Sequence, residues 1–180
     1  HVQKLLESNV TLTDVSFNCP ATTNKRYEKY HYIIYELSQP LASGQTLRMN
    51  FKQTLQPKGF EADNSDIDVV DNGTFFDNAV LPSFGYQKKY ELQEEDDRKH
   101  FALLPRKHKA KRDDVRELVN ARSGSDSDGI NLDIVISTTA PQTALTSGDL
   151  VATWNTNGRN YFHYKTNQQI INFYPVVSAD

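Results

Sequence analysis

Apolar and polar residues alternate over several stretches of the chain, and this period of two is typical of β-strands with one buried face. In residues 46–55, apolar side chains occupy every second position from Leu47 to Phe51. Residues 30–37 are rich in β-branched and aromatic residues, which favour strands. Residues 38–45, which lie between these stretches, contain Pro and Gly, so we predict that 30–37 and 46–55 form an antiparallel pair.

The last third of the chain shows the same pattern. Aliphatic residues occupy every second position from Ile130 to Ile136, and the Asn157-Gly158 dipeptide is favoured in two-residue hairpin turns. Short strands separated by turns indicate a twisted antiparallel sandwich or one large sheet. The strands predicted in this part cover residues 130–136, 150–154, 161–165 and 170–174.

The first 29 residues give a weaker pattern. A strand candidate covers residues 10–17, Pro20 ends it, and the polar residues 21–29 are predicted to form a loop. We interpret residues 1–29 as a lead-in to a single, mainly β domain that covers residues 1–180. A chain of this length can bury a sizeable core.

Residues 87–122 are the most highly charged part of the chain, and we interpret them as a partly helical connector. Short helices are predicted at 94–102 and at 113–121, and in the second of these apolar residues recur at helical spacing. The basic run 106–112 either contacts phosphates or anionic lipids, or is a solvated connector balanced by neighbouring acids. We favour the solvated connector.

Two acidic stretches, residues 61–71 and 125–129, resemble calcium loops because carboxylate oxygens are the ligands that this ion prefers. Neither stretch has the spacing of Gly and terminal Glu that an EF-hand loop requires. We therefore favour solvated loops over metal sites in both stretches.

Composition and motifs exclude several classes of function. A net charge of −3 gives no reason to expect nucleic acid as a partner, and no apolar run is long enough for direct membrane insertion. Cys19 is the single cysteine, and the five histidines form no H-E-x-x-H motif. We assign no catalytic residue, metal ligand or cofactor to this chain and expect that it is not itself an enzyme.

Residues 72–86 (NGTFFDNAVLPSFGY) combine Gly, Pro and four aromatic residues between two strand-like regions. We predict an ordered loop that contains a short strand. Its aromatic side chains either cap the core or contact a neighbouring domain, and we favour capping. These candidate site residues are Phe75, Phe76, Phe84 and Tyr86.

The order of several short motifs resembles a known family. NGTFF is followed by LPSFGY, by EDDRKHFALLPR, and then by LDIVIST, VATW, YFHYK and INFYPVVSA. Over about residues 30–180, this order is similar to the amino-terminal β domain of the aminopeptidase-N-like (gluzincin) zinc metallopeptidases. The similarity is strongest to the bacterial branch in which the peptidase region is joined to an ABC-transporter-type permease.

The resemblance implies a β domain that packs against a thermolysin-like catalytic domain and helps to shape its substrate cleft. Its partner would be the catalytic domain of the same parent chain, and zinc would belong to that domain alone. The parent would be a membrane-anchored protein, with this soluble domain on the extracytoplasmic side. Because the chain begins at His1 and lacks the family's catalytic motifs, we expect a fragment of a longer protein.

Two functions therefore follow from the sequence. The first is a non-catalytic accessory domain of a zinc aminopeptidase-like protein. The alternative is a free-standing β-sandwich module that binds a protein or a carbohydrate through exposed aromatic residues and has no peptidase partner.

Overall fold

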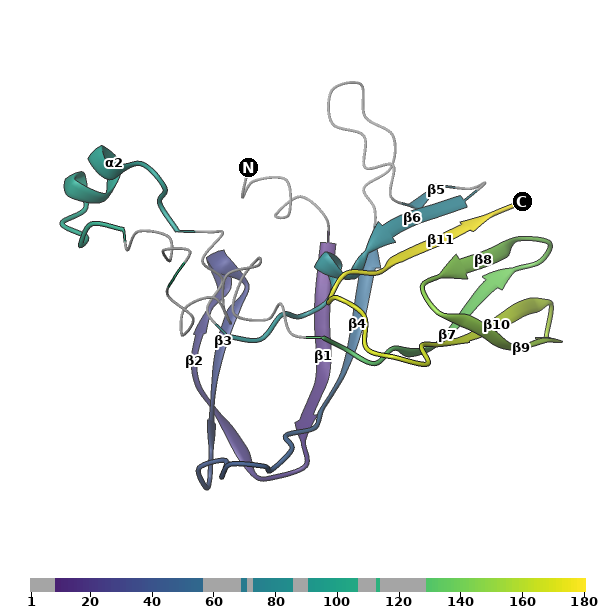
Figure 1. The fold of residues 1–180 in the computed structure, drawn as a ribbon, viewed down its shortest axis with the longest axis horizontal. Helices are drawn as coiled ribbons and strands as arrows, with labels where there is room; N and C mark the ends of the chain where they lie inside the picture. Colours follow the sequence, from purple (N-terminus) through teal and green to yellow (C-terminus); the bar gives the residue numbers. More distant parts are fainter. Residues whose placement is uncertain (1–8, 57–68, 71–72, 86–90, 107–112, 114–128) are drawn as a thin grey trace. The chain divides into compact units, whose positions relative to one another are not determined.

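The computed structural model confirms a mainly β chain whose paired strands are all antiparallel (Figure 1). The chain forms two compact units, divided near residue 58. The prediction of a single domain over 1–180, with a lead-in at 1–29 and a connector at 87–122, stays a prediction. The structure describes residues 9–56, 69–70, 73–85, 91–106, 113 and 129–180.

The first unit consists of two antiparallel strand pairs. Strand β1 (Asn9–Phe17) pairs with β4 (Met49–Gln56), and β2 (Ala21–Tyr27) pairs with β3 (Tyr32–Leu37). The short 3-10 helix η1 (Glu28–Tyr30) connects β2 to β3. Each described strand of this unit therefore has one hydrogen-bonded neighbour.

Two sequence predictions are wrong in this unit. The stretch 30–37 does not pair with 46–55, and the polar residues 21–29 form all of strand β2 and the start of η1 rather than a loop. Strand β2 gives no strand signal in the sequence because it is exposed almost throughout and so shows no apolar alternation. The turn of η1 places β3 beside β2, and a short connection costs less closure entropy than a long one.

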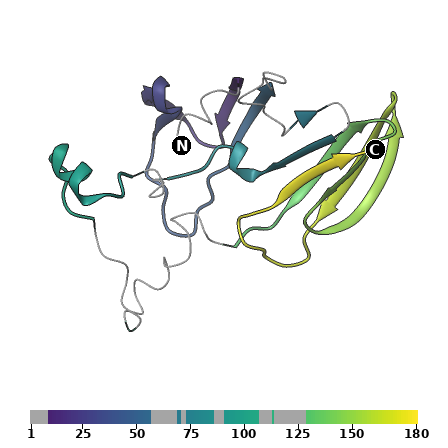
Figure 2. The same cartoon turned by 90° about the horizontal axis from the view of Figure 1, so that it is seen from above.

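The second unit contains two sheets, which Figure 2 shows from above. One sheet has the strand order β7-β10-β9 and the other has the order β5-β6-β11-β8. The first sheet comprises β7 (Asp133–Thr139), β10 (Arg159–Lys165) and β9 (Asp149–Thr156). The second comprises β5 (Val69–Val70), β6 (Gly73–Asp77), β11 (Pro175–Ala179) and β8 (Thr143–Thr146).

The core of the second unit lies between these two sheets. Tyr164 on β10 and Ala144 on β8 are both buried, and the Tyr164 hydroxyl donates a 2.9 Å hydrogen bond to the Ala144 carbonyl. This bond joins the sheets and satisfies a polar group that burial would otherwise leave unpaired. Among the described residues, the other buried side chains come from both sheets and their flanks: Leu132, Thr138, Val176 and Ser178.

The hairpin predicted at Asn157-Gly158 is confirmed. Both residues have positive φ, 52° and 72°, as a type I′ turn requires, and the turn joins β9 to β10. The strand predicted at 170–174 is wrong, because only Ile170 makes a bridge, to Ile130, and the strand starts at Pro175. Ile171 and Phe173 in this stretch are both more than half exposed.

The helix predicted at 94–102 is confirmed as α2 (Glu95–His100), and a short strand, β6, lies inside 72–86 as predicted. It is followed by the 3-10 helix η2 (Asn78–Val80). The helix predicted at 113–121 and the acidic stretch 125–129 lie outside the described residues, apart from Asp113 and Gly129. So do most of the acidic stretch 61–71 and of the basic run 106–112. No described helix has the length and apolar character needed to cross a membrane.

Candidate binding surface

The β7-β10-β9 sheet presents one face away from the core, which we call the outer face. Side chains alternate along a strand, so the buried Tyr164 places its neighbours His163 and Lys165 on the opposite side of the sheet. Residues directly opposite each other in the register share a face. The outer face therefore comprises Asp133, Val135, Ser137, Thr139, Asp149, Ala152, Trp154, Thr156, Arg159, Tyr161, His163 and Lys165.

An aromatic pair lies at the centre of the outer face. Trp154 on β9 is directly opposite Tyr161 on β10, with ring centroids 5.1 Å apart and planes within 9°. Offset parallel rings at this separation attract each other. Trp154 remains 43% exposed and Val135, two strands away, 51% exposed, so both apolar side chains are accessible to solvent.

A polar cluster adjoins the aromatic pair. The Asp133 carboxylate lies 2.6 Å from His163 Nε2 and 3.2 Å from Lys165 Nζ. The hydrogen bonds from His163 and then Lys165 hold the pKa of Asp133 below its ordinary value of 3.8. The cluster is open to solvent, so its groups are accessible to a ligand.

Arg159 lies at the opposite end of the outer face from this cluster. Its guanidinium group donates hydrogen bonds to the Ser137 side chain at 2.9 Å and to the Ser137 carbonyl at 2.8 Å. These bonds hold the side chain across β10 and β7. The outer face thus combines an exposed apolar centre with charged groups at both ends.

The four aromatic residues predicted as a site are not brought together on this face. Phe75 and Phe76 are neighbours on β6, in the other sheet, where Phe75 is 61% exposed and Phe76 is half-buried opposite Val176. Phe84 is exposed, and Tyr86 lies outside the described residues. Their role in capping or in a domain contact stays a prediction.

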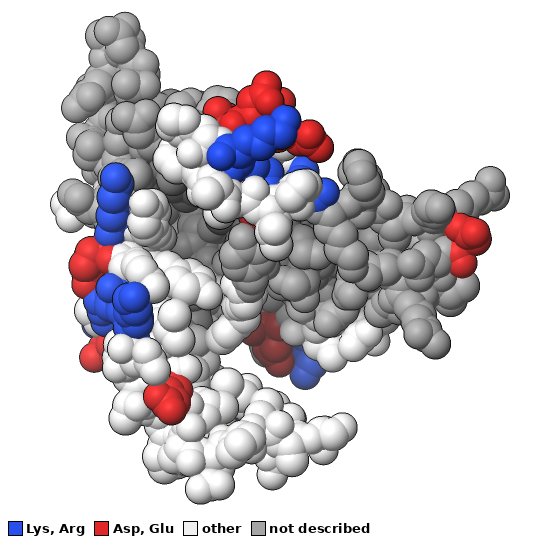
Figure 3. Space-filling view, turned by 90° about the vertical axis from the view of Figure 1, so that its left-hand side faces the viewer, with Lys and Arg blue, Asp and Glu red and all other residues white. Residues whose placement is uncertain are grey.

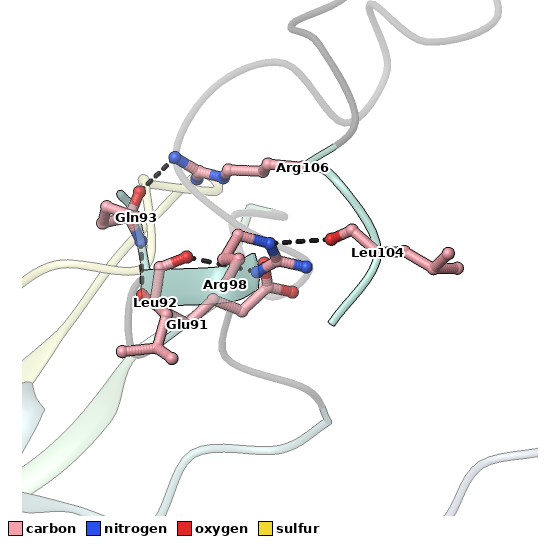
Figure 4. A network of polar contacts seen from close by, with 6 residues as sticks. All are labelled: Glu91, Leu92, Gln93, Arg98, Leu104 and Arg106. Atoms are coloured by element: carbon pink, nitrogen blue, oxygen red, sulfur yellow. Dashed lines mark hydrogen bonds and ion pairs between the residues drawn. The ribbon is translucent and has the colours of Figure 1, made fainter. Parts of the chain in front are cut away.

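The polar network around α2 serves local structure. Arg98 donates hydrogen bonds to the carbonyls of Leu104 and Leu92, at 2.9 and 3.1 Å (Figure 4). It also forms an ion pair with Glu91 at 3.4 Å. The guanidinium group is therefore occupied in connecting the helix to the segments on either side of it.

The first unit has a recess of about 250 Å³, and the polar side chain of Asn18 in its lining makes hydrogen bonds within the unit. Asn18, which lines it, donates to the Thr46 carbonyl and accepts from the Arg48 backbone N–H. Its polar side chain thus fixes the connection between strands. The remaining lining residues are Cys19, Leu41, Gln45 and Thr46.

Charge and potential metal ligands are dispersed. On the face that Figure 3 shows, the described basic and acidic side chains lie beside each other and form no field of one sign. Within the described part of the chain, no three His, Cys, Asp or Glu side chains gather as a metal site requires. The charge distribution on this face does not favour a nucleic-acid site, and the described side chains do not favour a metal site. The outer face therefore stays the candidate surface.

Comparison with known proteins returned no matching family model, no similar curated protein and no similar solved structure. The resemblance to the metallopeptidase β domain therefore rests on the order of motifs alone.

The sequence contains a signal for the outer face that apolar alternation does not reveal. A two-residue turn at Asn157-Gly158 fixes the hairpin register, so counting outward from it places Trp154 opposite Tyr161. The positions of Asp133 and Val135 on the outer face cannot be counted from this turn, because β7 is separated from β10 by other strands in the sequence. No local pattern specifies that pairing.

Proposed function

We propose that the chain is a non-catalytic protein-binding module and that the outer face of the β7-β10-β9 sheet is its contact surface. The observation that supports this function is the exposure of Val135 and Trp154 beside the charged cluster of Asp133, His163 and Lys165. Exposed apolar groups rimmed by charged groups are typical of protein interfaces.

A protein partner fits this surface better than a carbohydrate. Sugars stack on open aromatic faces, but one face of the Trp154 ring is covered by Tyr161. Val135, the other exposed large apolar residue of the outer face, is aliphatic and offers no ring. An apolar centre of this kind matches a complementary apolar protein patch, which would release water when buried.

The accessory-domain interpretation is a more specific form of this proposal. In that form, the partner is a zinc metallopeptidase domain of the same parent protein, and the outer face is one candidate for the contact. The order of motifs over about residues 30–180 supports it. Sequencing the full gene tests this form, which expects an H-E-x-x-H motif elsewhere in the same gene. A full gene without that motif would contradict the accessory-domain form of the proposal.

The first prediction tests the outer face directly. A photo-crosslinking amino acid placed at Val135 in the native cell should give one discrete protein adduct. The purified partner should bind the chain, and Trp154→Ala should weaken the Kd about tenfold or more, because aromatic anchors dominate interface energies. Titration calorimetry measures the difference.

Leu104→Ala is the matched control, since Leu104 is exposed but lies outside the outer face. It should leave the Kd unchanged. Equal weakening by both substitutions would contradict the assignment. A glycan ligand whose binding depends on Trp154, with no protein adduct at Val135, would replace the protein partner by a carbohydrate.

A further inference from the structure

Strand β9 is an unprotected edge of the β7-β10-β9 sheet. Its hydrogen-bonded neighbour among the described strands is β10, and all eight of its residues are exposed. The backbone groups along its other side therefore face outward from the sheet. Such an edge is a template on which another strand can pair.

The second sheet does not cover β9. Leu150 lies opposite Tyr164 in the register and so faces the same side of the sheet, yet Leu150 is 51% exposed whereas Tyr164 is 5% exposed. On the other side, Trp154 is also accessible. Strand β9 thus extends beyond the core with apolar side chains on both faces, and an added strand would give both faces new neighbours.

The sequence of β9 lacks the protective side chains that are common on an edge strand, and a bulge near its start is the protection that it has. Natural edges often carry Lys or Pro, and β9 has neither; its only charged residue is Asp149. A bulge at Val151 disturbs the strand near its start. The run 152–156 beyond the bulge pairs with β10 in regular register and stays available for pairing.

The chemistry of β9 fits a second copy of itself. In an antiparallel pair of identical strands, the two Asp149 carboxylates lie at opposite ends, so no like charges face each other. Each Asp149 instead approaches the uncharged Asn155–Thr156 end of the facing strand.

We infer that two copies of this chain pair through β9 in antiparallel orientation and form a continuous six-stranded sheet. The two-fold arrangement closes on itself, so pairing stops at a dimer. The inference is independent of the proposed function, because the dimer uses the backbone edge of β9 whereas the partner contact centres on the outer face. A dimer would place two outer faces on one sheet.

Sedimentation equilibrium of the full chain tests this inference. We expect a monomer–dimer equilibrium, with Val151→Lys weakening the dimer Kd about tenfold or more because it places a charged ammonium at the new strand junction. Val151 is 56% exposed, so a lysine there is compatible with the folded chain. Val135→Lys is the matched control, since Val135 is similarly exposed on β7, and it should leave the dimer Kd unchanged.

Hydrogen exchange supplies a second measurement. Amide exchange across residues 150–156 should slow as protein concentration rises in the wild-type chain, and Val151→Lys should abolish this dependence. A chain that stays monomeric up to about 1 mM would overturn the inference. So would a dimer whose β9 amides exchange as fast as those of the monomer. The two proposals can fail separately. If only the proposed function is wrong, the chain still dimerises but the crosslinker at Val135 gives no adduct with a partner protein.

Discussion

At the scale of single residues, burial is decided by the side of the sheet on which a side chain falls. Phe75 and Phe76 are adjacent on β6 and chemically identical, yet one is mostly exposed and the other is half-buried opposite Val176. The stabilising effect of an aromatic residue depends on the apolar area removed from water. The two phenylalanines should therefore differ in their contribution to stability.

Substitution of each by aspartate measures that difference. Phe76→Asp should lower the free energy of unfolding by about 1–3 kcal/mol, which corresponds to a fall of several degrees in Tm. Phe75→Asp should have a much smaller effect. Thermal unfolding followed by circular dichroism compares the two variants. Equal effects would show that the side of β6 on which a phenylalanine lies does not decide its contribution to stability.

Asp133 gives a pH-dependent prediction. Hydrogen bonds from His163 and Lys165 lower its pKa in the folded state, so the stabilisation is present above the ordinary value of 3.8 and is lost as pH falls through the folded pKa. Asp133→Asn should therefore be less stable than wild type near pH 7, with the gap closing in acid. Parallel Tm-versus-pH curves for the two proteins would exclude this role.

At the scale of elements, turns define which neighbouring strands pair. Gly158 closes the β9–β10 hairpin with φ of 72° and open space where a Cβ would lie. Gly148 precedes β9 with φ of 104°, and a Cβ there would come within 2.8 Å of the Lys165 carbonyl oxygen. The first position requires only the backbone conformation of glycine, whereas the second also requires its lack of a side chain.

Alanine substitutions separate these two requirements. Gly158→Ala should destabilise the second unit by about 1–2 kcal/mol, the cost of a left-handed conformation for an L-residue. Gly148→Ala should cost more, because the backbone of Lys165 would have to move. Denaturant unfolding of both variants gives the comparison, and a larger loss at Gly158 would contradict the clash.

At the scale of the whole molecule, the sequence predicts the class of fold better than its connections. Apolar alternation shows that a strand has a buried face, but it does not show which strand lies beside it. The Asn157-Gly158 hairpin can be predicted because its partners are joined by two residues. The pairing of β1 with β4, and the polar strand β2, leave no such local signal.

The stacked position of Trp154 also makes it a spectroscopic reporter. It is the only tryptophan in the chain, so emission excited beyond the tyrosine absorption band arises from this one ring. The ring is partly exposed against Tyr161, and covering it would shift the emission to shorter wavelength. Intrinsic fluorescence can therefore follow occupation of the outer face, and dimerisation at β9, without any label.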